Sequence, residues 1–333
     1  MKALRLVEYN TPYQLHEIPI PTITPNELLI KIGAAGFCHT DYQVYQGVYN
    51  SRIPMTPSHE PVGTIIEVGH KVSPEWKPGQ RIGMLNFRHA CNSCNGCEFA
   101  RDPLRPDEPD VRFCEKKDMA GMTADGGFAE YAVADPATCV RLPEGVEFEQ
   151  AAPLMCAGAT VWTGLDRLEL KAGLPVGVIG IGGLGALALQ FAAGLGYKTV
   201  AIDNRSEGLQ LARELPEHLR PGKVVDYNND QAAKEVVEFA GVVTEWSLKL
   251  LRTHAVCVPL GAPAEGFKFS AFDIHFKELT IRGALVANQR LASHMMKLVA
   301  EEGVRSHVQT IKLEEGMDLP IRYMDPHLRG RLV

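Results

Sequence analysis

The sequence has no long hydrophobic run and no excess of positive charge. No apolar stretch approaches the roughly 20 residues of a membrane-spanning helix, and Met1–Arg5 does not lead into the apolar core of a signal peptide. The net charge of −6 at pH 7 offers no basic footprint for nucleic acid or for an anionic membrane surface. We therefore expect a cytoplasmic protein that binds neither nucleic acid nor membranes.

A disulfide framework is not expected either. The chain of 333 residues contains eight cysteines, and without an export signal these favour metal or thiol chemistry. Hydrophobic residues make up 45% and charged residues 22% of the chain, which is ordinary for a globular protein. A chain of this length most often forms two domains.

Helical periodicity is weak before about residue 149. Short β-segments broken by proline and glycine fill this part of the chain, and the clearest are Leu28–Ile32 and Gly63–Gly69. This pattern is typical of a barrel-like β domain.

Three separated residues have the chemistry of a catalytic zinc site. Cys38, His59 and Cys156 would form a Cys₂His set, which leaves zinc one open position for water or substrate. Glu60 would supply an oxygen ligand when that position is empty. Taken alone, each residue is more often a buried thiol or a satisfied histidine than a ligand, so the assignment depends on the surrounding motifs.

A second group of cysteines is closely spaced. Cys91, Cys94 and Cys97 follow one another at intervals of three residues, a strong signal for structural zinc because such thiolates wrap one tetrahedral ion. Three ligands without a fourth, or no bound ion, remain the alternatives.

The segment after residue 175 has a dinucleotide-binding pattern. A strand over 176–179 leads into a glycine-rich turn that opens a helix, where the pyrophosphate would meet free main-chain N–H groups. The residues of this turn are Gly180, Gly182, Gly183, Leu184 and Gly185. Asp203 ends the next strand, 23 residues after Gly180, and an acid there favours NAD over NADP. The nearby Arg205 could bind a 2′-phosphate, so use of NADP remains an alternative.

The pattern then breaks where a fourth parallel strand is due. Strand 223–227 and helix 230–240 are followed by only Val242 and Val243 before a further helix over 244–251. Either these valines serve as a strand stub, or the chain is a splice or gene-model variant that folds poorly.

Together these segments resemble the zinc-dependent medium-chain alcohol dehydrogenases, in particular the yeast-like fungal branch. The matching motifs are GFCHTD (36–41), PSHEPVGTIIEVG (57–69), WKPGQRIG (76–83), the CxxCxxC run, GGFAEYAV (126–133), the segment around Cys156 and GIGGLG (180–185). The resemblance implies a two-domain α/β protein. Residues 1–152 and 288–333 would form a GroES-like β-barrel catalytic domain, and 153–287 a Rossmann domain with a doubly wound parallel sheet whose fourth strand is missing or truncated.

The resemblance also implies roles for single residues. Thr40 would bond the substrate oxygen and begin proton removal, and Asp41 would hold the ligand His59 from behind. Cys114 would be the fourth structural ligand, returned to the metal by an insertion of about nine residues relative to the family. Cofactor contacts would come from His39, Thr160, Val286 and Arg331. Relatives often pass the proton to solvent through a histidine, and here that position is Gln43. Substrate-wall positions correspond to Tyr49 and Asn86.

The implied activity is hydride transfer between an alcohol, or an aldehyde or ketone, and NAD(H), with two zinc ions per chain. A homo-oligomer, either a dimer or a tetramer, is expected. Two alternatives remain open: a zinc-free enoyl or quinone reductase of the same superfamily, and an inactive zinc-binding paralogue or splice variant that results from the gap near 241–243.

Overall fold

The computed structural model describes residues 1–102, 105–229, 247–261 and 266–333. These residues divide into two compact units, one formed by Met1–Ala159 with Ala287–Val333 and the other by Thr160–Val286. The domain limits predicted from the sequence differ from these by several residues and stay a prediction. None of the helices in the described part of the chain combines the length and hydropathy needed to cross a membrane.

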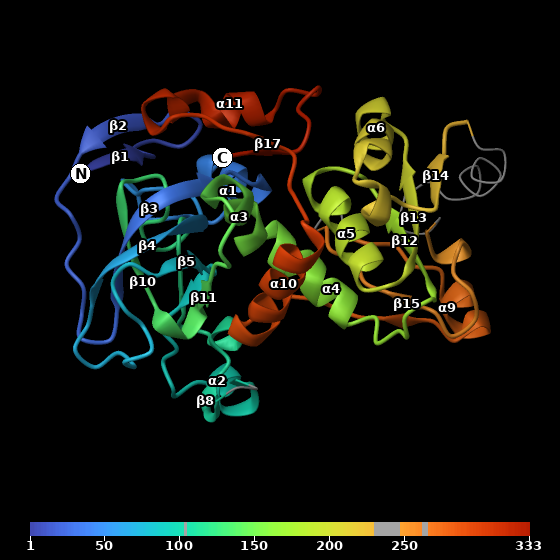
Figure 1. The fold of residues 1–333 in the computed structure, drawn as a ribbon, viewed down its shortest axis with the longest axis horizontal. Helices are drawn as coiled ribbons and strands as arrows, with labels where there is room; N and C mark the ends of the chain where they lie inside the picture. Colours follow the sequence, from blue (N-terminus) through green and yellow to red (C-terminus); the bar gives the residue numbers. More distant parts are fainter. Residues whose placement is uncertain (103–104, 230–246, 262–265) are drawn as a thin grey trace. The chain divides into compact units, whose positions relative to one another are not determined.

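The first unit is built on a five-stranded antiparallel sheet (Figure 1). The strand order is β10 (Tyr131–Ala134), β3 (Leu28–Gly36), β4 (Glu60–Val68), β5 (Arg81–Met84) and β11 (Cys139–Arg141). The two long strands contain the predicted segments 28–32 and most of 63–69. Among the described residues this sheet does not close into a barrel, because β10 and β11 are its unpaired edges.

Short elements surround this sheet. Paired strands are β1 (Lys2–Arg5) with β2 (Gln14–Glu17), β6 (Phe87–Arg88) with β9 (Asp118–Met119), β7 (Arg101–Asp102) with β8 (Arg105–Pro109), and β17 (Val308–Gln309) with β18 (Arg331–Leu332). Helices are α1 (His39–Tyr45), α2 (Asn95–Phe99), α3 (Phe148–Ala151), α10 (Gln289–Glu302) and α11 (Leu319–Tyr323). Short 3₁₀ turns are η1 (Val111–Phe113), η2 (Pro136–Thr138), η3 (Ala152–Met155) and η5 (Leu313–Asp318).

Two hydrophobic cores stabilise the first unit. One lies along the sheet and includes Ile30, Ile65, Ile82 and Met84. The other gathers Phe37, Val44, Met122, Phe128 and Leu332 around the start of α1. Each such side chain contributes about 1.5–3 kcal/mol when fully buried, so the start of α1 is anchored by packing from several segments.

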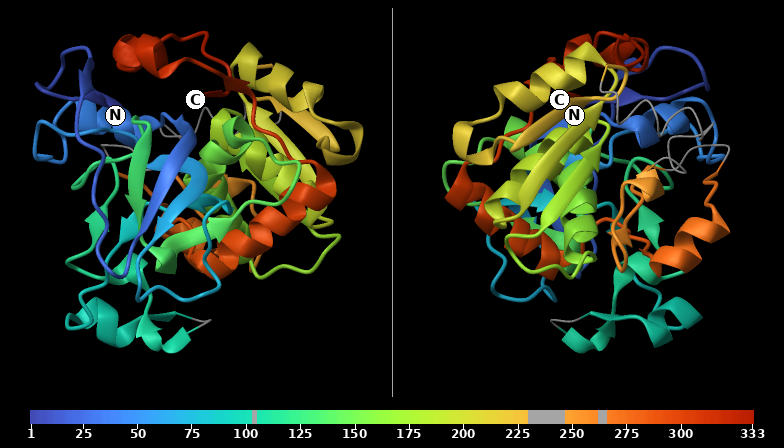
Figure 2. Two further views of the ribbon diagram at one scale, coloured as in Figure 1. Left: turned by 60° about the vertical axis from the view of Figure 1, so that its left-hand side comes forward. Right: turned by 90° about the vertical axis from the view of Figure 1, so that its right-hand side faces the viewer.

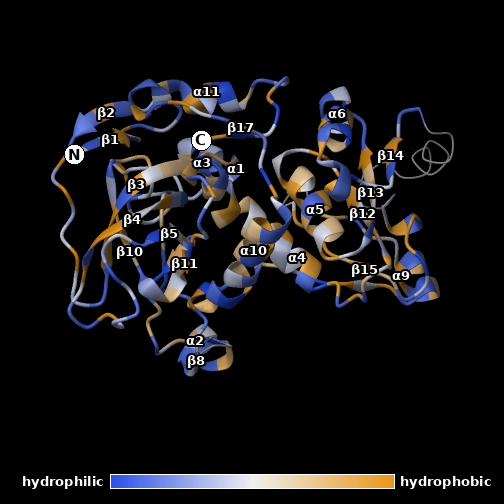
Figure 3. Cartoon of the chain, viewed as in Figure 1, coloured by the Kyte–Doolittle hydropathy of each residue, from blue (hydrophilic) through white to orange (hydrophobic). Residues whose placement is uncertain are grey.

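The second unit contains the parallel sheet β12 (Pro175–Ile179), β13 (Lys198–Asp203) and β14 (Lys223–Asp226), with α5 (Gly183–Gly194) and α6 (Ser206–Glu214) packed against it (Figure 2). A separate parallel pair is formed by β15 (Val256–Cys257) and β16 (Thr280–Ile281). The unit also contains α4 (Ala157–Asp166), which begins in the first unit, η4 (Glu217–Leu219) and α9 (Ala271–Lys277). Figure 3 shows α5 in hydrophobic colours along most of its length, as its buried leucine and alanine residues require.

The region of the predicted fourth strand lies outside the described residues, together with Val242, Val243 and the helix predicted over 230–240. In the part that is described, β12 and β15 belong to separate sheets.

Candidate metal centres and dinucleotide site

Cys38 stands at the junction of β3 and α1. It is the N-cap of α1, where its Sγ accepts a bond from the Thr40 main-chain N–H (3.4 Å). Asp41 closes the capping box by accepting from the Cys38 N–H (2.9 Å). The helix start is therefore fixed from both sides, and with it the position of the thiol.

Asp41 also fixes the imidazole of His59. Its Oδ1 lies 3.0 Å from His59 Nδ1 and accepts from the Ser58 N–H at 3.2 Å. The other ring nitrogen, Nε2, lies 3.3 Å from Cys38 Sγ. An acceptor on Nδ1 leaves Nε2 free to bind a metal, which is the arrangement that a ligand histidine needs.

Cys156 and Glu60 complete the cluster. Cys156 follows the 3₁₀ turn η3, and Glu60 begins β4. One ligand atom from each of Cys38, His59, Glu60 and Cys156 lies within 4.8 Å of all the others. One oxygen of Glu60 pairs with Arg331, while Oε2 is buried without a hydrogen-bond partner among the described residues.

Burial and neighbouring charges perturb the protonation of these groups. A hydrogen bond from Cys156 lowers the pKa of the Cys38 thiol well below its usual value, although burial opposes this. Burial disfavours a charged His59, but Asp41 and the two thiols outweigh it and raise the pKa of His59. Burial raises the pKa of Glu60 to about 7, against the attraction of Arg331. The cluster therefore concentrates groups that would be stabilised by a buried divalent cation.

The donor set fits zinc. Bond lengths of about 2.3 Å to sulfur and about 2.0–2.1 Å to nitrogen in a tetrahedron imply a separation of about 3.6 Å between the two donors, close to the 3.3 Å found between Cys38 Sγ and His59 Nε2. The unpartnered Glu60 oxygen also lies within reach of the cluster.

The second cysteine group forms a separate lobe. Cys91, Cys94, Cys97 and Cys114 each place a sulfur within 4.8 Å of the other three. Individual Sγ–Sγ distances are 3.5 Å for Cys94–Cys97, 3.9 Å for Cys91–Cys97 and 4.0 Å for Cys94–Cys114. A zinc tetrahedron has S–S edges of about 3.8 Å, whereas a disulfide would need about 2.05 Å.

The chain between Cys97 and Cys114 returns through α2, the strands β7 and β8, and η1. The register pairs Arg101 with Pro109 and Asp102 with Arg105. The inserted segment, expected from the sequence to be a loop, contains the paired strands β7 and β8. Main-chain N–H groups of Glu115 and Lys116 approach the sulfurs of Cys94 and Cys114 at 3.3 Å each, as thiolate ligands require.

The glycine-rich turn lies between β12 and α5. Gly180 has a φ of 83°, which a residue with a side chain rarely adopts. Gly182 is the N-cap of α5 and has no side chain to bond the first N–H groups of the helix. A Cβ on Gly185 would collide with the Gly180 carbonyl oxygen. The turn thus packs closely and leaves the helix N-terminus available to an anion.

Asp203 lies at the end of β13 and is 3% exposed. Its carboxylate accepts main-chain bonds from Ile181 (2.5 Å), Asn204 (2.8 Å) and Arg205 (2.8 Å). Through the bond from Ile181, Asp203 connects the glycine turn to the end of β13, a contact that the sequence pattern does not predict. The Arg205 side chain is half exposed, with Nε 3.5 Å from Asp203 Oδ1.

The remaining predicted residues are distributed over both units. His39 and Thr40 are the first residues of α1, and Thr160 lies on α4. Val286 is buried with a φ of 23°, unusual for a β-branched residue. Arg331 lies on β18 against Glu60.

Two residues near the metal cluster were missed by the sequence reading. Ser58 has a φ of 78° and bonds the Gly36 carbonyl through Oγ (2.9 Å). Tyr323 on α11 packs its ring against Phe37 (5.2 Å between centroids) and His39 (6.1 Å). Ser58 directly precedes the ligand His59, which was the available signal, whereas nothing in the sequence singles out Tyr323.

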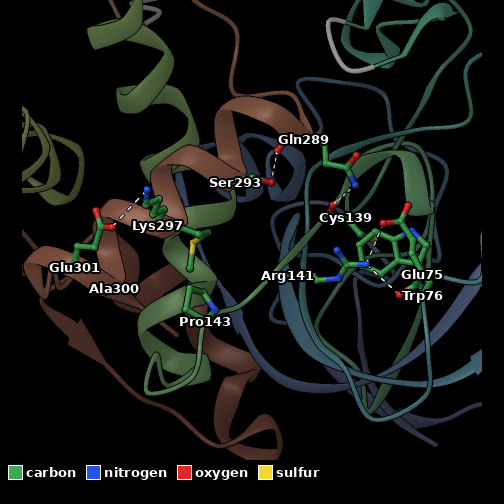
Figure 4. A pocket seen from close by; sticks show the side chains of 11 residues that line it. Glu75, Trp76, Cys139, Arg141, Pro143, Gln289, Ser293, Lys297, Ala300 and Glu301 are labelled. Atoms are coloured by element: carbon green, nitrogen blue, oxygen red, sulfur yellow. Dashed lines mark hydrogen bonds and ion pairs between the residues drawn. The ribbon is translucent and has the colours of Figure 1, made fainter.

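A cavity of about 540 Å³ lies elsewhere in the first unit, between the β11 region and α10 (Figure 4). Its charged side chains are already paired, Arg141 with Glu75 (3.1 Å) and Lys297 with Glu301 (3.7 Å). None of the predicted ligands lines it, so this cavity is separate from the candidate site.

A Cys₂His cluster with an adjacent carboxylate, a four-cysteine lobe and a glycine-rich βαβ turn define the class of zinc-containing, dinucleotide-dependent dehydrogenases. Comparison with known families agrees. Residues 24–144 match the family described as "Alcohol dehydrogenase GroES-like domain", and residues 183–301 match "Zinc-binding dehydrogenase".

Among curated proteins, an alcohol dehydrogenase from Geobacillus stearothermophilus is 34% identical over 314 residues, covering 90% of this chain and 89% of the relative. One from Rhizobium meliloti (strain 1021) is 34% identical over 304 residues, covering 87% and 85%. The solved alcohol dehydrogenase of the archaeon Aeropyrum pernix superposes with a TM-score of 0.79 at 27% identity, covering 100% of this chain and 99% of its own.

The chain belongs to the zinc-binding alcohol dehydrogenase family. Its cofactors are zinc and a nicotinamide dinucleotide, and its activity is oxidoreduction of an alcohol or carbonyl compound. The predicted yeast-like branch stays a prediction.

Proposed function

We propose that the chain oxidises alcohols, and reduces the corresponding aldehydes or ketones, at a zinc ion held by Cys38, His59 and Cys156. The observation that carries this proposal is the convergence of these ligand atoms and Glu60 within 4.8 Å. Cys91, Cys94, Cys97 and Cys114 would hold the second, structural zinc.

Each cofactor supplies part of the chemistry. A bound zinc ion acts as a Lewis acid toward an alcohol or carbonyl oxygen. The nicotinamide supplies hydride exchange, for which the protein contributes binding and orientation.

The chain's own residues position the reaction. As an acceptor at Nδ1, Asp41 favours the His59 tautomer that is protonated at Nδ1, and Nε2 then faces Cys38. The Thr40 hydroxyl, two residues after Cys38, would receive the alcohol proton at Oγ1. Gln43 cannot titrate, so the proton would leave by way of water and the cofactor ribose. Glu60 would bind the metal when the substrate position is empty.

The nucleotide would bind through Gly180, Gly182, Gly183, Leu184 and Gly185, with His39, Thr160, Val286 and Arg331 as further contacts. Asp203 already accepts three main-chain bonds. A carboxylate has about four acceptor sites, so Asp203 would still accept a hydrogen bond from the adenosine ribose. We propose a preference for NAD over NADP. Arg205 supports residual NADP use, so Arg205→Ala should lower NADPH affinity more than NADH affinity in fluorescence titrations.

The metal requirement is tested with Cys156→Ser. Turnover should be abolished, whereas Cys257→Ser, a change at a half-buried cysteine outside both clusters, should leave activity intact. Retained turnover in the Cys156 variant would favour a zinc-free reductase.

NADH binding to the zinc-replete chain tests the inactive-paralogue alternative, because loss of the fourth strand would destroy the nucleotide site. The position of that predicted strand lies outside the described residues. Saturable enhancement of nicotinamide fluorescence is expected. A folded chain that retains zinc and binds no NADH would contradict the proposal. A cytoplasmic location and a dimer or tetramer are further proposals, the latter checked by light scattering.

A further inference from the structure

The predicted ligand Cys156 reaches the metal cluster on a different segment from the other three ligands. Cys38 stands between β3 and α1, and His59 directly precedes β4, which begins at Glu60. The five-stranded sheet therefore places these three residues. Cys156 instead follows the turn η3 and directly precedes α4, with a φ of −123° and a ψ of −68° that belong to neither helix. The position of its sulfur depends on how η3 packs against the sheet.

Gly83 provides the space in which η3 rests on the sheet. The turn packs against β3, β4 and β5, and Gly83 lies in β5 between Val62 of β4 and Val140 of β11. A Cβ on Gly83 would overlap Sδ of Met155 and would lie 2.8 Å from its Cε. The thioether of Met155 thus occupies the space that a side chain at Gly83 would need.

Met155 has no free space into which it could retreat. Its side chain is 0% exposed and the adjacent Leu154 is 1% exposed, in an interior that is packed as closely as a crystal. The far side of the segment is also confined, because a Cβ on Gly158 would lie 2.8 Å from Leu154 and 3.2 Å from the sulfur of Met295. A displacement of Met155 is therefore passed on to the next residue, Cys156.

We propose that Gly83 is a positioning residue for the metal centre: by leaving room for Met155, it holds Cys156 where zinc needs its sulfur. The inference rests on the proposed function, because it takes Cys156 to be a zinc ligand. Carbon atoms in contact are about 3.5–4.0 Å apart, so a Cβ at Gly83 would push Met155 by about 1 Å or more. A functional site tolerates only about 0.5 Å.

The direct test is Gly83→Ala in the zinc-loaded enzyme. Chelator competition should show that one of the two zinc ions is bound about tenfold more weakly, while the ion of the four-cysteine lobe is unaffected. With cobalt in place of zinc, the visible spectrum should shift, because it reports the geometry of the thiolate ligands. The value of kcat/KM should fall together with the metal affinity.

Gly33→Ala is the matched control. A Cβ on Gly33, in β3, would collide with the ring of Phe148. This ring is partly exposed and lies eight residues before Cys156, so it can turn toward solvent without moving the thiol. Gly33→Ala should therefore leave zinc affinity and the cobalt spectrum unchanged, even if it lowers the free energy of unfolding.

A compensating change at Met155 makes the test independent of how well Gly83→Ala folds. Met155→Val lacks Sδ and Cε, the two atoms nearest to the added Cβ. Alone it should weaken zinc binding, because the gap above Gly83 loosens the turn. Adding Gly83→Ala to Met155→Val should fill that gap and restore zinc affinity. A double variant that binds zinc no better than Met155→Val overturns the inference.

Unchanged zinc affinity and an unchanged cobalt spectrum in Gly83→Ala also overturn the inference, because Met155 would then repack without moving Cys156. The proposed function still stands in that case if Cys156→Ser is inactive. A Cys156→Ser variant that keeps two zinc ions and full turnover overturns both.

Discussion

At the scale of single residues, Asp41 is the most connected side chain of the metal cluster. Asp41→Asn should weaken zinc binding about 10–100-fold, because the amide replaces an acceptor of three N–H bonds with a group that both donates and accepts. Competition with a chelator measures this, and the exposed Asp166→Asn serves as control. Equal zinc affinity in both variants would show that Asp41 does not orient His59.

The buried pair of Glu60 and Arg331 makes a second prediction. Glu60→Gln should lower the free energy of unfolding by about 3–5 kcal/mol, because it leaves the buried Arg331 without its counter-charge. Replacing Arg331 by Met in the same chain should recover part of the loss, since the uncompensated charge is then gone. Urea unfolding measures both, and additive losses would contradict the coupling.

At the scale of elements, the glycine turn of α5 gives a matched pair of substitutions. Gly185→Ala should weaken NADH binding at least tenfold, because its Cβ would push against the Gly180 carbonyl and open the turn. Gly177→Ala lies on β12, where an added Cβ meets nothing within 4 Å. Fluorescence titration of both should separate them, and a normal Kd for Gly185→Ala would remove the turn from the binding site.

The four-cysteine lobe should be separable from catalysis. Cys114→Ser should lower zinc from two ions to one per chain and expose the lobe to protease, because its four thiols are brought together from distant parts of the segment. Activity per remaining zinc should change little before the lobe unfolds. Metal analysis and limited proteolysis measure this, and two retained zinc ions would exclude Cys114 as a ligand.

The sequence predicted elements where local chemistry dominates. The spacing of Cys91, Cys94 and Cys97 and the glycine turn with its acid are local patterns. Strands β3, β12, β13 and β14 and helix α5 also lie where they were expected. Contacts between residues that are distant in the sequence could not be predicted in this way. That Oδ1 of Asn86 is unpaired among the described residues depends on how Met122 packs far along the chain, and the bonds of Asp203 depend on how Ile181 packs.

At the scale of the whole molecule, the two units divide the proposed chemistry. All eight predicted metal ligands belong to the first unit, and the glycine turn and Asp203 to the second. Dialysis against a chelator should therefore abolish turnover while NADH binding persists, although more weakly. Loss of NADH binding in parallel with zinc, in a chain that stays folded, would show that the metal also supports the nucleotide site.

The bonds of Asp41 have a consequence for how this enzyme can diversify. One carboxylate supports the helix start, the Ser58 main chain and the imidazole together. A substitution of Asp41 would thus remove three hydrogen bonds at once. Selection for new substrates would therefore act on residues outside this hydrogen-bonded frame, because a change at Asp41 disturbs the helix start and the ligand imidazole at once.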